Sequence, residues 1–146
     1  MTADEAWAFV ESAHTGIFTT LRRDGFPIAL PIWFATLDRR IYLSTRGKKV
    51  TRVANDPRCS FLVEAGERWA ELQAVHLTGV ANIIEPDDEL GARFAEQIRS
   101  KYGAFRTTTK AMPDATREVY AAAGTMIEIV PDERIVSWDN NLLGLA

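Results

Sequence analysis

One short segment of the sequence, residues 44–52, gathers side chains that could bind an anion. It reads Ser-Thr-Arg-Gly-Lys-Lys-Val-Thr-Arg, with four cations and three hydroxyls, although the whole chain carries a net charge of −3. The segment is predicted to lie where a strand passes into a helix. A phosphate there would meet free N–H groups, the hydroxyls of Ser44 and Thr45, and the ammonium group of Lys48 or Lys49. A solvated basic loop is the alternative, and the residues alone leave both interpretations open.

A second segment could supply a surface for a planar ligand. It is Leu-Pro-Ile-Trp at residues 30–33. A proline within a strand removes a ladder donor, which leaves neighbouring backbone groups free for something other than a strand. Trp33, on the same face as Pro31, would form an aromatic wall. The alternative is that Trp33 belongs to the core, while Pro27 and Pro31 protect an edge strand.

Other reactive side chains give little support to a catalytic or metal site. His14 and His76 are far apart in sequence and neither lies in a metal-binding pattern, so no metal is expected. Cys59 opens an apolar segment and is interpreted as a small core residue rather than a nucleophile. The glycines form neither a dinucleotide-binding nor a P-loop pattern. No catalytic residue is assigned.

Composition places the chain among ordinary globular proteins. It has 146 residues, of which 47% are hydrophobic and 25% charged, so we expect one domain spanning residues 1–146. Its pI of about 5.4 argues against a general nucleic-acid binder. No apolar run is long enough to cross a bilayer, and a single cysteine excludes an internal disulfide. We therefore expect a cytoplasmic protein that binds neither nucleic acid nor membrane.

The hydrophobic patterns predict mainly β structure with several helices. A helix is predicted over 3–13 from its capping box, over 47–55 from its helical periodicity, and over 86–103 from its opening proline and acidic residues. A short helix is also predicted over 114–122. Alternating or β-branched segments predict strands over 16–21, 26–36, 41–44, 59–64, 69–84 and 125–130, with 135–138 extending the sheet. A bulge is expected near Gly79. This order of strands favours a small antiparallel barrel of α+β class.

Together these segments resemble the flavin-binding split β-barrel family related to pyridoxamine 5'-phosphate oxidase. The resemblance rests on the leading helix, Gly-Ile-Phe-Thr-Thr at 16–20, the turn at Asp24 and Gly25, Pro-Ile-Trp-Phe at 31–34, residues 41–49, and Asn-Asp-Pro-Arg at 55–58. It implies a six- to seven-stranded antiparallel split barrel and a homodimer with the cofactor at its interface. It also implies which residues bind the cofactor: Ser44, Thr45, Arg46, Lys48 and Lys49 for its phosphate, and Pro31, Ile32 and Trp33 for its ring.

Within this family the sequence is most similar to the actinobacterial branch that uses the deazaflavin coenzyme F-420, because of its size, its Thr-Arg-Gly-Lys-Lys run and its tail. The resemblance implies hydride transfer to a small conjugated organic acceptor. An FMN-dependent oxidoreductase and a flavin- or deazaflavin-binding protein without turnover are the alternatives. True pyridoxamine phosphate oxidases carry an Arg-Leu-His substrate segment near their C-terminus, whereas this chain has Val-Ser-Trp-Asp-Asn at 136–140. Vitamin B6 oxidation is therefore not expected. With only two histidines in the chain, haem binding is disfavoured.

Overall fold

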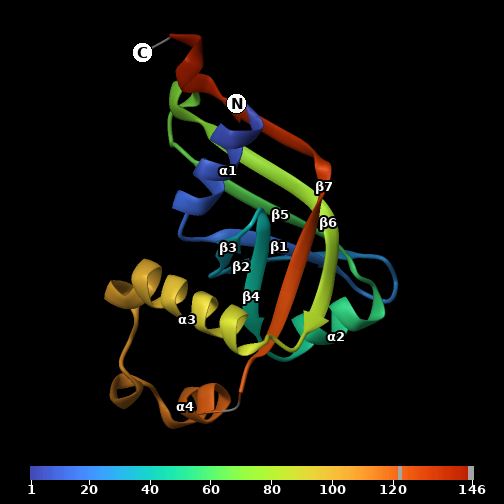
Figure 1. The fold of residues 1–146 in the computed structure, drawn as a ribbon, viewed down its shortest axis with the longest axis vertical. Helices are drawn as coiled ribbons and strands as arrows, with labels where there is room; N and C mark the ends of the chain where they lie inside the picture. The colour runs from blue at the N-terminus through green and yellow to red at the C-terminus, as the bar shows by residue number, and fades with distance from the viewer. Residues whose placement is uncertain (122, 145–146) are drawn as a thin grey trace.

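The fold is built on one curled, seven-stranded antiparallel sheet (Figure 1). The structure is a computed structural model that describes residues 1–121 and 123–144. In chain order the strands are β1 (Gly16–Leu21), β2 (Pro27–Ile32), β3 (Ala35–Leu37), β4 (Arg40–Thr45), β5 (Arg58–Ala65), β6 (Gln73–Ile84) and β7 (Thr125–Asp139). Their order in the sheet is β2-β1-β5-β6-β7-β4-β3. This confirms the predicted α+β split barrel.

The described residues also form four α-helices: α1 (Ala3–Ser12), α2 (Lys48–Asn55), α3 (Asp88–Tyr102) and α4 (Asp114–Ala121). The predicted capping box is confirmed at α1, where Thr2 Oγ1 accepts from the Glu5 N–H at 3.2 Å and Glu5 Oε2 accepts from the Thr2 N–H at 2.6 Å. Pro86 is not the first residue of α3, because the Asp87 carboxylate caps the helix by accepting from the Leu90 N–H. The predicted end of α4 at residue 122 lies outside the described residues.

The single strand predicted over residues 26–36 is wrong, because the chain leaves one edge of the sheet and joins the other there. Strands β2 and β3 lie at opposite edges, yet only Trp33 and Phe34 separate them in sequence. The three peptide links from Ile32 to Ala35 span about 11 Å at most. The sheet must therefore curl until its two edges approach each other, and among the described residues no ladder joins them.

Two other predicted strand boundaries are also corrected. Residues Trp69–Glu71 form a 3-10 turn, so β6 begins at Gln73 rather than at Trp69. Strand β7 runs without a break through residues 131–134, which joins the two segments predicted there into one strand. The irregularity expected near Gly79 is present, but β7 supplies the extra residues, since Leu77 pairs with Ile135 and Gly79 with Pro131.

The core fills the inside of the curled sheet and lies directly behind the connection between β2 and β3. Phe34, in that connection, is fully buried and packs edge-to-face on Phe61, with ring centroids 4.9 Å apart. Large buried side chains from several strands complete the core: Phe18, Ile41, Leu43, Val63, Val75, Leu77, Ile127 and Ile129. A closely packed interior of this kind holds the strand ends in fixed positions.

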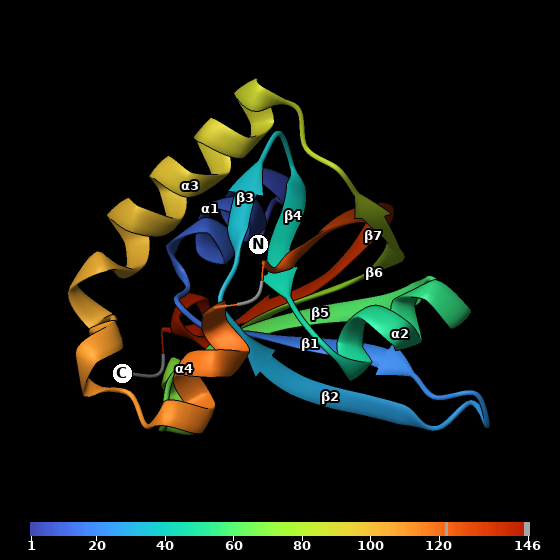
Figure 2. The ribbon, with the colours of Figure 1, turned by 90° about the horizontal axis from the view of Figure 1, so that it is seen from below.

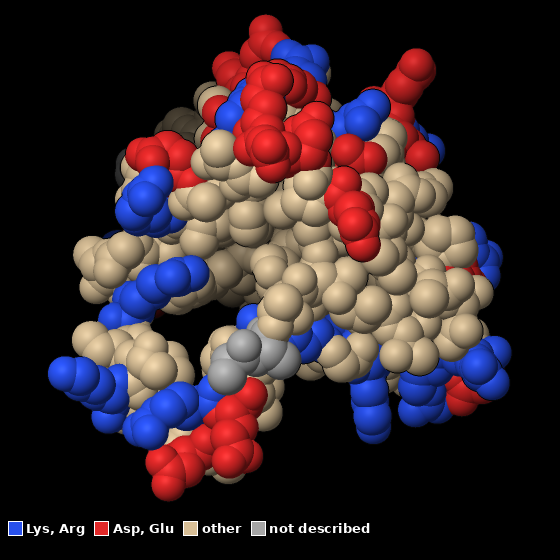
Figure 3. Space-filling view, turned by 60° about the horizontal axis from the view of Figure 1, so that its bottom comes forward, with Lys and Arg blue, Asp and Glu red and all other residues tan. Residues whose placement is uncertain are grey.

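Residues 103–121 form an arm that stands away from the sheet (Figure 2). The arm contains the 3-10 turns Gly103–Phe105 and Thr109–Ala111, and it ends in α4. Arg117 organises it internally by donating to the carbonyl oxygens of Thr109 at 3.2 Å and Met112 at 3.1 Å. The space-filling view shows an opening between the arm and the body of the protein (Figure 3).

Candidate functional site

The structure brings the two predicted halves of the cofactor site to the same end of one hairpin. Strands β3 and β4 pair with Ala35 opposite Tyr42. Trp33 lies two residues before Ala35, and Ser44 lies two residues after Tyr42, so both segments leave this hairpin at the same end (Figure 2). The aromatic segment and the basic segment therefore border one region, which neither segment indicates by itself.

Trp33 forms an exposed aromatic wall at this end. Its indole is 39% exposed, so the interpretation of Trp33 as a core residue is wrong. The indole stacks on the ring of Tyr102, with centroids 4.4 Å apart and planes 9° from parallel. Of its neighbours, Pro31 is exposed and Ile32 half-buried. Strand β2 is an edge strand, as Pro27 and Pro31 predict.

Tyr102, the last residue of α3, holds the Trp33 segment in place. Its ring is fully buried. Its hydroxyl accepts from the Phe34 N–H at 3.0 Å and donates to the Phe34 carbonyl oxygen at 3.1 Å, and burial raises the pKa of the phenol. The sequence pattern gives Tyr102 no role beyond a place in the helix predicted over 86–103. Its polar tip was the available signal, because a buried tyrosine hydroxyl needs a partner.

The basic half of the site begins at the end of β4 and continues into α2. Gly47 precedes the helix with φ at +71°, a backbone conformation that glycine adopts easily and other residues rarely do. Among the described residues, no side chain caps the N-terminus of α2. Its first N–H groups are therefore available to an anion, close to the ammonium groups of Lys48 and Lys49.

The side chains of the basic segment differ in how open they are. Ser44 and Lys48 are exposed, and Arg46 and Lys49 are half-buried. Thr45 is only 8% exposed, so it is the least accessible of the predicted phosphate ligands. Together they still offer three cations and an exposed hydroxyl, a donor set that fits a phosphate group.

Arg52, the fourth cation of the segment, has a structural role. Its Nε donates to the Thr20 hydroxyl at 2.7 Å, which joins α2 to β1. Thr20 is buried, so this hydrogen bond satisfies a polar group in the interior. Arg52 is therefore not counted with the predicted phosphate ligands.

The arm connects the two halves of the site. It leaves the barrel directly after Tyr102, beneath Trp33, and the chain rejoins the barrel at Gly124. A Cβ atom on Gly124 would lie 2.3 Å from Ser44 Oγ, so any other residue there would require the Ser44 hydroxyl to turn away. Near the end of the arm, the Arg46 guanidinium carbon lies 5.2 Å from the centroid of the Tyr120 ring. Sequence reasoning assigned no role to Tyr120 or Gly124.

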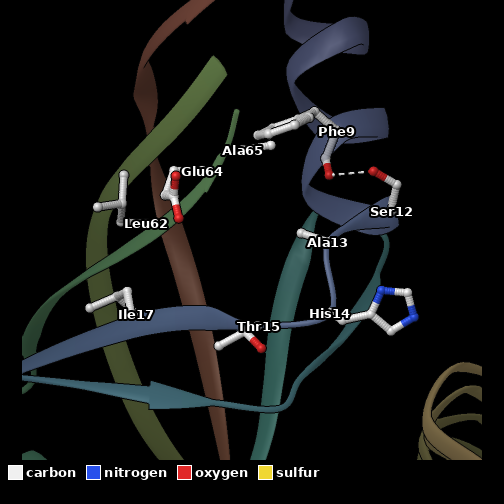
Figure 4. Close-up of a pocket in the computed structure, with 9 residues that line it drawn as sticks. All are labelled: Phe9, Ser12, Ala13, His14, Thr15, Ile17, Leu62, Glu64 and Ala65. Atoms are coloured by element: carbon white, nitrogen blue, oxygen red, sulfur yellow. Dashed lines mark hydrogen bonds between the residues drawn. The ribbon is translucent and has the colours of Figure 1, made fainter. Parts of the chain in front are cut away.

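A hollow of about 300 Å³ beside α1 is lined by two ionisable side chains that do not act together. Figure 4 shows His14 and Glu64 among its lining residues, but the imidazole points away from the carboxylate. The His14 ring instead meets the edges of Tyr102 and Phe105, at centroid distances of 5.8 and 5.3 Å. The two side chains therefore do not form an acid–base pair.

The structure supports the interpretation of Cys59 as a packed side chain. Its Sγ donates to the Gly79 carbonyl oxygen at 3.6 Å, and burial raises the pKa of the thiol to about 12. Such a thiol is a poor nucleophile at neutral pH. Within residues 1–121 and 123–144, no group of three or more His, Cys, Asp or Glu side chains is placed to hold a metal ion. In the same part of the chain, no helix has the length and apolarity to cross a membrane.

Comparisons with known proteins agree with this fold. The family model described as pyridoxamine 5'-phosphate oxidase matches residues 2–131. No curated protein matches the chain. A solved structure of a conserved hypothetical protein from Mycobacterium tuberculosis is 31% identical, with a TM-score of 0.81, and the match covers 100% of this chain and 89% of that one.

More distant structures share the fold and differ in the ligand that their descriptions name. A FAD-binding protein from Mesorhizobium loti is 15% identical, with a TM-score of 0.71 and coverage of 94% of each chain. A heme-binding protein from Mycobacterium smegmatis is 19% identical, with a TM-score of 0.67, over 96% of this chain and 58% of that one. The family match covers most of the chain, from the leading helix into β7. This chain is therefore a member of the pyridoxamine 5'-phosphate oxidase family.

Proposed function

We propose that this protein is an oxidoreductase that uses coenzyme F-420 to reduce a small conjugated organic acceptor. The observation that supports this proposal is the position of Trp33 and the basic segment at one end of the β3–β4 hairpin. An aromatic wall beside a cluster of cations and uncapped N–H groups suits a cofactor that combines a planar ring with a phosphate.

The residues of the site would divide the work of binding. Lys48, Lys49 and Arg46 would neutralise the phosphate, while Ser44 and the first N–H groups of α2 donate hydrogen bonds to it. Trp33, fixed by its stack on Tyr102, would set the plane of the ring, with Pro31 and Ile32 along its edge. Thr45 would contribute chiefly through its backbone, because its side chain belongs to the buried set.

When bound in its reduced form, the cofactor would supply a hydride, which carries both electrons to one end of a conjugated double bond, while a proton from water completes the other end. The protein's task is then to hold the acceptor against one face of the ring and to limit the access of water. No side chain is assigned as the proton donor.

We further propose that the protein works as a homodimer with the site at the subunit interface. Large apolar side chains are exposed on one face of β6 and β7, which supports a partner there: Val80, Val136 and Trp138. Trp69 is also exposed, and its carbonyl oxygen accepts from the side chain of Asn140, just after the end of β7. An exposed apolar surface of this kind is typical of an association site. Sedimentation at micromolar concentration tests the dimer, and a monomer would contradict it.

Equilibrium binding of coenzyme F-420 and FMN to the wild type and to Lys48→Ala and Lys49→Ala tests the function. Each substitution is expected to weaken binding of the preferred cofactor by about tenfold, because a charge-assisted contact is lost. Arg58→Ala is a matched control, since Arg58 pairs with Asp56 at the far end of α2. Unchanged affinity in both lysine variants would show that the phosphate assignment is wrong.

An FMN- or FAD-dependent oxidoreductase is the second candidate, because solved structures with this fold carry the description FAD-binding. Purified protein with a flavin absorbance spectrum would favour it over coenzyme F-420. A cofactor-binding protein without turnover is the third candidate, because another solved structure with this fold is described as a heme-binding protein. Oxidation of the reduced cofactor that never exceeds the acceptor-free rate, across enones and quinones, would favour that third candidate.

A further inference from the structure

The arm is placed to act on the proposed phosphate site from outside the barrel. It begins after Tyr102, which carries the aromatic half of the site, and ends before Gly124, which packs against Ser44 in the basic half. Its last helix, α4, brings Tyr120 over Arg46. Both ends of the arm are therefore fixed to the site, although its middle stands away from the sheet (Figure 3).

Tyr120 contributes little to the core. Its side chain is 60% exposed, and its neighbour Val119 is 57% exposed. The contact that the structure gives its ring is with the Arg46 guanidinium, 5.2 Å from the centroid, within the range of a cation–π interaction. An aromatic face against the guanidinium restricts the conformations of a long, flexible side chain. Arg46 then has less conformational freedom to lose when it binds an anion.

From this contact we infer that Tyr120 is a positioning residue, which holds Arg46 ready for the cofactor phosphate and so favours phosphorylated over unphosphorylated forms of the cofactor. The inference rests on the proposed function, because it assumes that Arg46 meets the phosphate. Tyr120 itself touches neither ring nor phosphate in this scheme. Its effect should therefore appear only when both Arg46 and a phosphate are present.

The test compares two ligands that differ in their phosphate. Dissociation constants are measured for coenzyme F-420 and its phosphate-free chromophore, and for FMN and riboflavin, with the wild type, Tyr120→Ala and Tyr120→Phe. Tyr120→Ala is expected to weaken the phosphorylated member of the pair that binds by about three- to tenfold, because Arg46 must then lose the conformational freedom of one long side chain on binding. Its affinity for the phosphate-free partner should not change. Tyr120→Phe keeps the aromatic face and should restore wild-type affinity.

Val119→Ala is the matched control, because Val119 lies next to Tyr120 on α4 and has a similar exposure. An equal loss in this variant would show that the arm acts only as a general cover and would overturn the inference. Equal weakening of phosphorylated and phosphate-free ligands by Tyr120→Ala would overturn it too, as would no weakening at all.

A double variant separates this inference from the proposed function. In an Arg46→Ala background, Tyr120→Ala is expected to cause no further loss of affinity, because the residue through which it acts is gone. If Arg46→Ala alone leaves binding unchanged, Arg46 does not meet the phosphate and the proposed site is wrong at that position. If Arg46→Ala weakens binding but Tyr120→Ala does not, the site stands and only the role of Tyr120 is refuted.

Discussion

Two tyrosines border the same site, one from the packed barrel and the other from the exposed arm. Tyr102 is fully buried, bonds both backbone groups of Phe34 and stacks on Trp33. Tyr120 is 60% exposed and meets one guanidinium. The barrel wall around Tyr102 is thus fixed by packing and hydrogen bonds at once, while the arm is held by contacts at its ends. The protein therefore has a rigid surface beside Trp33 and, in the arm, a more loosely held segment at the edge of the same site.

The largest expected difference between the two regions is in global stability. Tyr102→Ala should lower the free energy of unfolding by about 3–5 kcal/mol, because it removes a buried aromatic ring and leaves Phe34 without its partner. Tyr120→Ala should change it by less than about 0.5 kcal/mol, as is usual for an exposed side chain. Urea denaturation measures both. Similar losses of unfolding free energy in the two variants would show that the arm is held as firmly as the barrel around Tyr102.

Tyr102→Phe isolates the hydrogen bonds from the packing. The variant keeps the ring beneath Trp33 but leaves the buried N–H and C=O of Phe34 unsatisfied, which should cost about 1–3 kcal/mol. Urea denaturation again gives the value. A Tyr102→Phe protein as stable as the wild type would mean that the stack alone holds this segment.

Within the described part of the chain, Lys101 carries the one buried side-chain nitrogen or oxygen atom that makes no hydrogen bond. Its Nζ lies 3.8 Å from the centroid of Phe34 and, among the described residues, has no hydrogen-bond partner. Burial lowers the pKa of Lys101 to about 8 from 10.5, although the carboxylate of Glu11 opposes the shift. The folded state then binds fewer protons than the unfolded state between about pH 8 and 10.5.

The buried ammonium group of Lys101 therefore lowers the free energy of unfolding by its full amount below about pH 8. This destabilisation disappears as the pH rises toward 10.5. In Lys101→Met the charge is absent at every pH. We expect the variant's advantage in the free energy of unfolding over the wild type to shrink as pH rises from 7 to 10. Thermal or urea unfolding at several pH values measures the difference. A constant difference would show that Lys101 has an ordinary pKa.

The smallest expected effect on the barrel is that of Arg117→Ala. Arg117 bonds the carbonyl oxygens of Thr109 and Met112, so its loss should loosen the arm without unfolding the protein. Limited trypsin digestion should cut after Lys110 about severalfold faster, while global stability changes by less than about 0.5 kcal/mol. Arg99→Ala, on the exposed face of α3, is the control. Equal cleavage in the two variants would contradict the role of Arg117.

Features that depend on neighbouring residues could be predicted from the sequence. The capping box at Thr2 and Glu5, the turn at Asp24 and Gly25, and the strands on either side of that turn rest on local rules, and the structure has them. The basic segment was found for the same reason, because its residues are adjacent in the chain. Whether they bind a phosphate stays a prediction.

The remaining features depend on distant parts of the chain. The break between β2 and β3 occurs where Tyr102, 68 residues from Phe34, replaces the ladder partners of that residue. The approach of Gly124 to Ser44 and of Tyr120 to Arg46 likewise follows from where the arm returns. No periodicity within a single segment encodes such a meeting, because it is set by tertiary packing.

The attachment of the arm at both ends has a consequence for how such proteins diversify. Extending a surface loop between fixed ends costs little conformational entropy, because the closure penalty rises only slowly with length. Insertions or deletions between the two attachment points would thus reshape what the site admits while leaving the strands undisturbed. A single barrel could in this way serve many substrates, with selection acting on about twenty residues rather than on the fold.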